Sequence, residues 1–132
     1  MQKSFPATLD NLKNIRLFLT SFLKDHNVED IIINQIELGV DEAASNIIKH
    51  SYKGENKDKE INIKLEISKK KISIHLFDNG DPADPKKIKP RDLKEIKTGG
   101  LGTHFIQEVM DEVKWKNKSK GWANHLTLVK YL

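Results

Sequence analysis

The sequence contains no cysteine in its 132 residues, which excludes a disulfide framework, a thiolate metal site and a cysteine nucleophile. No apolar run approaches the roughly 20 residues of a membrane span, and the N-terminal stretch lacks the apolar segment of a signal peptide. The composition is 37% hydrophobic and 32% charged, as in globular proteins. These features predict a cytoplasmic protein with one domain over residues 1–132 and no membrane partner.

Arginine is also scarce, because Arg16 and Arg91 are the only two in a chain of net charge +4. The lysines are interspersed with acids, as in residues 57–60. Sequence-specific readers of nucleic acid usually depend on arginine, and single-strand binders add exposed aromatic residues. Neither feature is present, so we expect no direct contact with nucleic acid.

Two segments have apolar residues at a helical period of 3.6. The first runs from a cap at Thr8 or Asp10 to about His26, and the second from about Glu29 to Ser51. The apolar face expected for the first helix is Leu9, Leu12, Ile15, Phe18, Leu19 and Phe22. The core stripe expected for the second is Ile33, Ile36, Val40, Ala44 and Ile47.

Alternating apolar and polar residues predict the strands. They are expected at residues 2–7, 61–67, 72–78, 113–116 and 124–131. A helix is expected from Gly99 to about Asp111. Residues 81–98 contain three prolines and no period, and loops of this length are usually lids or binding loops. The order β-α-α-β-β-loop-α-β-β predicts an α+β sandwich with helices on one face of the sheet.

The second predicted helix carries a polar face. Glu42, Asn46 and Lys49 are spaced i, i+4 and i+7 and therefore share one side. A solvated face is the simplest explanation. The functional alternative is a carboxylate base beside an amide oxygen that ligates Mg²⁺, since this ion prefers oxygen ligands. Lys49 and His50 then meet phosphates as point charges.

A second polar segment follows a predicted apolar strand and contains Asp78, Gly80 and Pro82. Asn-Gly is by itself sufficient for a tight turn. The functional alternative is that the Asp78 carboxylate accepts a hydrogen bond from the 6-amino group of adenine. Gly80 would then let the base approach the backbone closely.

A glycine-rich turn precedes the last predicted helix. Its candidate phosphate-binding residues are Gly99, Gly100, Leu101, Gly102 and Thr103. Free N–H groups at a helix N-terminus bind anions, and glycines admit phosphate close to the main chain. The turn is not a Walker A loop, because no Lys-Ser or Lys-Thr follows it. It is not a dinucleotide-binding fingerprint either, because the strand before it and the acidic residue after it are missing.

In order and spacing, the three segments resemble the N, G1 and G2 boxes of the GHKL ATPases. The matching residues are Glu42…Asn46…His50, Asp78-x-Gly80-x-Pro82 and Gly99-Gly100-x-Gly102. Within that superfamily the chain is most similar to the anti-sigma-factor serine/threonine protein kinases. Phe5-Pro6-Ala7 and Met110-Asp111-Glu112-Val113 also match, so the resemblance spans almost the whole chain.

The resemblance implies a Bergerat fold, which is a two-layer α+β sandwich with a mixed, mostly antiparallel sheet. It implies that Mg-ATP binds between the long helix and a lid at about residues 84–98. Carried over by position, Glu42 is the general base, Asn46 the Mg²⁺ ligand and Asp78 the adenine-recognition residue. Gly100 and Gly102 line the phosphates.

The resemblance also implies partners. Family members phosphorylate a STAS-domain anti-anti-sigma protein, and many sequester a sigma factor, often as homodimers. The alternative function is a non-catalytic, ATP-gated protein-binding switch. Glu42 favours the kinase, because a pure switch does not need a carboxylate one turn before Asn46.

Three positions depart from the family pattern or stay open. Ser51 stands where glycine or alanine is common, and because it is small we expect little effect. Asn124 or Thr127 could replace the threonine that often lies near adenine. Arg91 is the only arginine in the lid, so the residue that clamps the γ-phosphate is unassigned.

Overall fold

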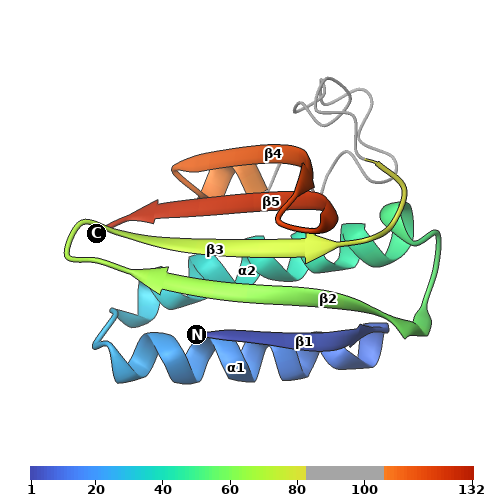
Figure 1. Ribbon diagram of the computed structural model, residues 1–132. Coiled ribbons are helices and arrows are strands. Elements are labelled where there is room, and N and C mark those ends of the chain that lie inside the picture. Colours follow the sequence, from blue (N-terminus) through green and yellow to red (C-terminus); the bar gives the residue numbers. More distant parts are fainter. Residues whose placement is uncertain (83–105) are drawn as a thin grey trace, which may run out of the picture.

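The computed structural model describes residues 1–82 and 106–132, which form a five-stranded sheet covered on one face by helices (Figure 1). The strand order is β1-β2-β3-β5-β4, and all four pairings are antiparallel. The strands are β1 Gln2–Ala7, β2 Asn56–Ile67, β3 Lys71–Asp78, β4 Glu112–Ser119 and β5 Trp122–Tyr131. The helical elements are η1 Leu9–Asn11, α1 Leu12–Asp25, α2 Asp30–Asn46 and the π-helical turn η2 Ile47–Ser51, and residues 106–109 are also helical.

This architecture confirms the expected α+β sandwich, but the sheet of the described residues is entirely antiparallel and not mixed, because each strand runs opposite to its neighbours. The strand pairing has one consequence for function: β3 and β5 are neighbours in the sheet, so Asp78 at the end of β3 lies opposite Asn124 near the start of β5. These two residues are far apart in the sequence. The register therefore brings two polar side chains to one end of the sheet.

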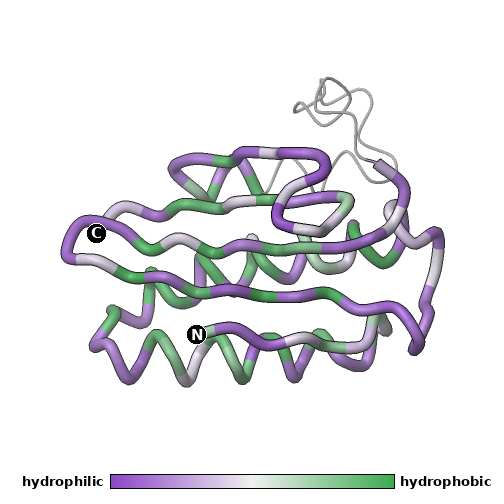
Figure 2. Tube along the Cα trace, viewed as in Figure 1, coloured by the Kyte–Doolittle hydropathy of each residue, from purple (hydrophilic) through white to green (hydrophobic). Residues whose placement is uncertain are grey.

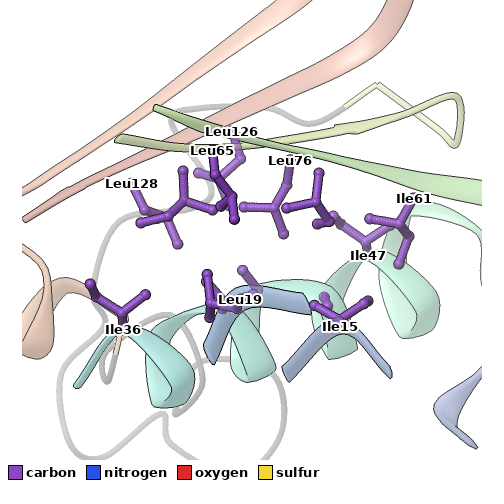
Figure 3. Close-up of a cluster of buried hydrophobic side chains, with 14 of the residues drawn as sticks. Ile15, Leu19, Ile36, Ile47, Ile61, Leu65, Leu76, Leu126 and Leu128 are labelled. Carbon is purple, nitrogen blue, oxygen red and sulfur yellow. The ribbon is translucent and has the colours of Figure 1, made fainter. Parts of the chain in front are cut away.

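The hydrophobic core lies between the helices and the sheet, where apolar side chains of both layers meet (Figure 3). Apolar and polar residues alternate along the strands in Figure 2, as a sheet with one covered face requires. The stripe predicted on the second helix is entirely buried. Each isoleucine or valine side chain of this stripe contributes about 1.5–3 kcal/mol by burial. The prediction for Leu9 is wrong, because this residue is 43% exposed in the short η1 turn that precedes α1.

The second predicted helix is divided into two kinds of helix. The α-helical part α2 ends at Asn46, and the π-helical turn η2 continues to Ser51. The N–H of Tyr52 donates to the carbonyl of Ile47 at 2.9 Å, which is the i→i+5 spacing of a π-helix. Single π-helical turns of this kind occur frequently at functional sites.

Gly39 in the middle of α2 has a packing role. A Cβ atom there would lie 3.2 Å from Met110 Sδ and 3.4 Å from Val109 Cγ2. The residue without a side chain therefore lets the segment 106–110 pack directly on α2. In the described part of the chain, no helix has the length and apolar character needed to cross a membrane.

Candidate functional site

The candidate site is centred on Asp78, which ends β3 and is only 3% exposed. Three donors converge on one of its carboxylate oxygens, Oδ1. The Ser51 hydroxyl donates at 2.5 Å, the Gly80 N–H at 2.9 Å and the Asn124 side-chain amide at 2.9 Å. A buried carboxylate needs such partners, because an unpaired charge away from water is costly.

The second oxygen of Asp78, Oδ2, accepts no hydrogen bond from the described residues. Among these residues, no buried side-chain nitrogen or oxygen lacks a partner. It follows that Oδ2 retains some contact with solvent, although the side chain as a whole is buried. One oxygen is thus anchored to the protein, and the other is available as an acceptor for an external donor such as an amino group.

Gly80 is required by a close approach of two chain segments. A Cβ atom on Gly80 would lie 2.3 Å from Ser51 Oγ and 2.4 Å from the Ser51 carbonyl oxygen. No side chain fits at these distances. The Asp81 N–H also donates to the Ser51 carbonyl at 2.8 Å, which holds the turn after β3 against the end of η2.

Tyr52 and Asn79 brace the same turn. The Asn79 N–H donates to the Tyr52 hydroxyl at 2.9 Å, and this hydroxyl donates to the Glu60 carbonyl at 2.6 Å. Burial raises the pKa of Tyr52 above its usual 10, outweighing the hydrogen bond from Asn79. The Asn79 side-chain oxygen accepts from the Ala123 N–H at 2.9 Å and ties the turn to β5. The turn is therefore fixed from both sides.

Two residues of this cluster were undervalued or left undecided by sequence reasoning. The Ser51 hydroxyl, expected to have little effect, donates directly to Asp78. Between the two candidates in the last strand, Asn124 is the one beside Asp78, whereas the Thr127 hydroxyl contacts His75 and His125. No local sequence signal reveals these contacts, since they join segments 27 to 73 residues apart.

The polar face of α2 is present as predicted for Glu42 and Asn46. Both side chains are half-buried, and neither makes a hydrogen bond or ion pair with a described residue. They lie one turn apart in regular α-helix, so they share a face. Their oxygens are consequently available to a ligand.

Lys49 and His50 are exposed and lie in η2, beyond the end of the α-helix. The i+7 relation that placed Lys49 on the face of Glu42 assumed 3.6 residues per turn throughout. The π-helical turn changes that spacing. The predicted common face is therefore supported for the first two residues only.

The remaining predicted site residues lie outside the described residues or at their edge. Pro82 is the last residue described before the gap and is exposed. The predicted lid at about residues 84–98 and the glycine-rich turn fall within residues 83–105, which are outside the described part. The turn residues concerned are Gly99, Gly100, Leu101, Gly102 and Thr103.

The sequence profile of the histidine kinase-like ATPase domain matches residues 5–130. The chain belongs to this family. It is similar to the serine-protein kinase RsbW of Staphylococcus aureus strain bovine RF122 / ET3-1, with 36% identity over 116 residues, covering 82% of this chain and 73% of that kinase. The RsbW of strain Newman is similar to the same extent, with 36% identity over 116 residues and the same coverage.

Solved structures agree on the fold. The nucleotide-free catalytic domain of the histidine kinase ThkA matches 99% of this chain and 97% of its own, with a TM-score of 0.58 and 13% sequence identity. A second crystal form gives a TM-score of 0.59 with 15% identity. At this identity the likeness concerns the fold alone, which is the GHKL α+β sandwich expected from the sequence.

Proposed function

We propose that this chain is an ATP-dependent serine/threonine protein kinase of the anti-sigma-factor type. Its proposed substrate is a hydroxyl side chain of a STAS-domain anti-anti-sigma protein. The observation that carries the proposal is a pair of half-buried residues on α2, Glu42 and Asn46, whose oxygens have no hydrogen-bond partner among the described residues. Asp78 ends β3, and the C-terminal end of α2 and the end of β3 lie at the same end of the sandwich (Figure 1). The similarity to a protein named a serine-protein kinase supports it.

The adenine base is assigned to Asp78. Its free oxygen, Oδ2, accepts a hydrogen bond from the 6-amino group of adenine, while Ser51, Gly80 and Asn124 donate hydrogen bonds to the other oxygen. The carboxylate therefore does not have to reorganise when a base binds. Gly80 leaves the backbone without a side chain beside the base, and Pro82 follows in the same turn.

We assign binding of the ATP phosphates to the part of the site that lies on α2. Bound Mg²⁺ would supply charge neutralisation on the phosphates, with the Asn46 side-chain oxygen as its protein ligand. One amide oxygen suffices, because this ion usually keeps several waters and phosphate oxygens. Lys49, His50 and the glycine-rich turn, Gly99–Thr103, are proposed to contact the phosphates.

Glu42 is proposed as the general base. It would accept the proton of the substrate hydroxyl as that oxygen forms its bond to the γ-phosphorus. The bond from phosphorus to the β–γ bridging oxygen breaks, and ADP leaves. Positioning and charge supply most of the catalysis in such reactions. The carboxylate has no hydrogen-bond partner in the described residues that would hold it away from this role.

The proposed partners follow from the family resemblance. They are a STAS-domain protein as the phosphoryl acceptor, a sigma factor held by the kinase, and a second copy of the chain in a homodimer. We place the protein in the cytoplasm, where these partners occur, and take residues 1–132 as one ATPase domain.

The test is a single-turnover assay with γ-labelled ATP, Mg²⁺ and each STAS-domain protein of the same genome. The expected result is transfer of label to a serine or threonine of one of them. If the chain binds ATP but labels none of these proteins, the kinase proposal fails, and the non-catalytic ATP-gated switch becomes the better function.

A further inference from the structure

The Ser51 hydroxyl, on the last residue of η2, forms hydrogen bonds with two other side chains of the site. It donates to Asp78 Oδ1 at 2.5 Å and accepts from the Asn124 side-chain amide at 3.1 Å. The same amide nitrogen lies 2.9 Å from Asp78 Oδ1 and 2.9 Å from the Asp81 carbonyl oxygen. Ser51, Asp78 and Asn124 therefore form a closed triangle of hydrogen bonds.

This triangle depends on η2. The π-helical turn carries the chain from Asn46 to Ser51, and the N–H of Gly54 then donates to the Ile48 carbonyl at 2.7 Å. The Ser51 carbonyl is engaged by the Asp81 N–H, so the backbone as well as the side chain is fixed against the turn after β3. A fixed backbone holds the hydroxyl at one place relative to the carboxylate.

All three donors act on the same oxygen of Asp78, so the carboxylate cannot exchange its two oxygens without breaking them together. The available oxygen Oδ2 is thereby kept at one position, where it can only accept a hydrogen bond. We propose that Ser51, together with Asn124, is a positioning residue that makes the site selective for a 6-amino purine over a 6-oxo purine.

The chemistry of the two bases gives the reason. Adenine presents an amino donor at position 6, which pairs with a carboxylate oxygen. Hypoxanthine, the base of inosine triphosphate, presents a carbonyl oxygen there, and two acceptors facing each other do not bond. A carboxylate fixed by three donors favours adenine by a directed hydrogen bond, whereas a carboxylate that rotates forms this bond less well.

This inference rests on the proposed assignment of Asp78 to adenine and adds a role for Ser51 that its small size alone would not give it. A residue that merely filled space would affect both nucleotides equally. The discriminating quantity is thus the ratio of the affinities for ATP and inosine triphosphate, not the affinity for ATP alone.

The test is isothermal calorimetry of ATP and inosine triphosphate on the full chain and on Ser51→Ala. We expect ATP binding to weaken about 3- to 10-fold, as for the loss of one hydrogen bond, while inosine triphosphate binding is unchanged. Ser51→Thr keeps the hydroxyl and should keep the wild-type ratio. Ser73→Ala is the matched control, because Ser73 is on the same strand as Asp78, five residues away, and half-buried.

The outcomes separate the claims. A lowered ratio in Ser51→Ala, with a wild-type ratio in Ser73→Ala, supports positioning. Equal weakening of both nucleotides, or no change in the ratio, overturns it. If Ser51→Ala does not fold by urea unfolding, Asn124→Ala is measured in the same way with the same criteria. A wild type that does not distinguish the two nucleotides overturns the inference, whereas failure of phosphoryl transfer with normal ATP selectivity affects the proposed kinase function only.

Discussion

Acidification is expected to destabilise this protein through two histidines on the sheet face that points away from the core. His125 is 5% exposed, and its Nε2 lies 2.8 Å from His75 Nδ1. His75 Nε2 lies 2.6 Å from Glu66 Oε1, and His125 Nδ1 lies 2.9 Å from the Ser119 hydroxyl. One set of neutral tautomers satisfies these three contacts: Ser119 donates to His125, His125 to His75, and His75 to Glu66.

Protonation disrupts this chain. A second proton on His75 resides on Nδ1 and faces the Nε2–H of His125, whereas a second proton on His125 resides on Nδ1 and forces the Ser119 hydroxyl to accept instead of donate. Burial lowers the pKa of His125 from 6.5 to about 4, reinforced by His75 and by Lys120, Lys116 and Lys64. Burial also lowers the pKa of His75, against the opposing effect of Glu66. At about 1.36 kcal/mol per pKa unit, the lowered pKa of His125 alone corresponds to about 3 kcal/mol of the free energy of unfolding at neutral pH.

The direction of this pH dependence follows from the linkage between protonation and folding. The unfolded chain binds the proton more readily than the folded protein, so this stability is fully present above pH 6.5 and is lost as the pH falls toward 4. Urea unfolding between pH 7.5 and 4 should show a loss in the wild type about 3 kcal/mol larger than in His125→Gln. His50→Gln is the control, since His50 is exposed. Parallel stability curves for the wild type and His125→Gln would refute the reasoning.

Two further substitutions test the site itself. Gly80→Ala should destabilise the protein by about 1–3 kcal/mol and weaken ATP binding, because the new Cβ would lie 2.4 Å from the Ser51 carbonyl oxygen. Urea unfolding measures the stability and calorimetry the ATP affinity, and an unchanged stability would contradict the close approach. Glu42→Gln should bind Mg-ATP nearly as the wild type does, yet transfer phosphate at least about a hundredfold more slowly in single-turnover assays. Wild-type transfer by Glu42→Gln would remove Glu42 from the role of base, and Asn46→Ala should instead weaken the Mg²⁺-dependent binding.

The sequence was sufficient for the parts of the fold that local patterns determine. Period-3.6 and period-2 patterns predicted the helices, the strands and the buried stripe of α2, because each side of these elements meets a uniform environment. The strand β2 begins at Asn56, earlier than the expected residue 61, because its first residues are exposed and show no alternation. The π-helical turn was missed, since apolar spacing does not distinguish i+4 from i+5 contacts over a single turn.

The candidate site divides in the same way. Asp78, Gly80, Glu42 and Asn46 were predicted from motifs that are local in sequence. The hydrogen bonds of Ser51 and Asn124 to Asp78 depend on the pairing of β3 with β5 and on the end of η2. Such contacts arise from tertiary structure, and only the folded protein reveals them. The histidine pair was missed for the same reason, because His75 and His125 are ordinary outward-facing strand positions in the sequence.

The central claim is that Asp78 recognises adenine through a hydrogen bond to its free carboxylate oxygen. The substitution Asp78→Asn tests this claim most directly. The three donors would hold the carbonyl oxygen of the substituted side chain in the place of Oδ1, so its amide nitrogen would point N–H groups at the 6-amino group of adenine. Losing a hydrogen bond to a charged group costs about 1.5–3 kcal/mol of binding free energy. Calorimetry should therefore show ATP affinity at least roughly tenfold weaker than in the wild type. Wild-type ATP affinity in a folded Asp78→Asn protein would contradict the account.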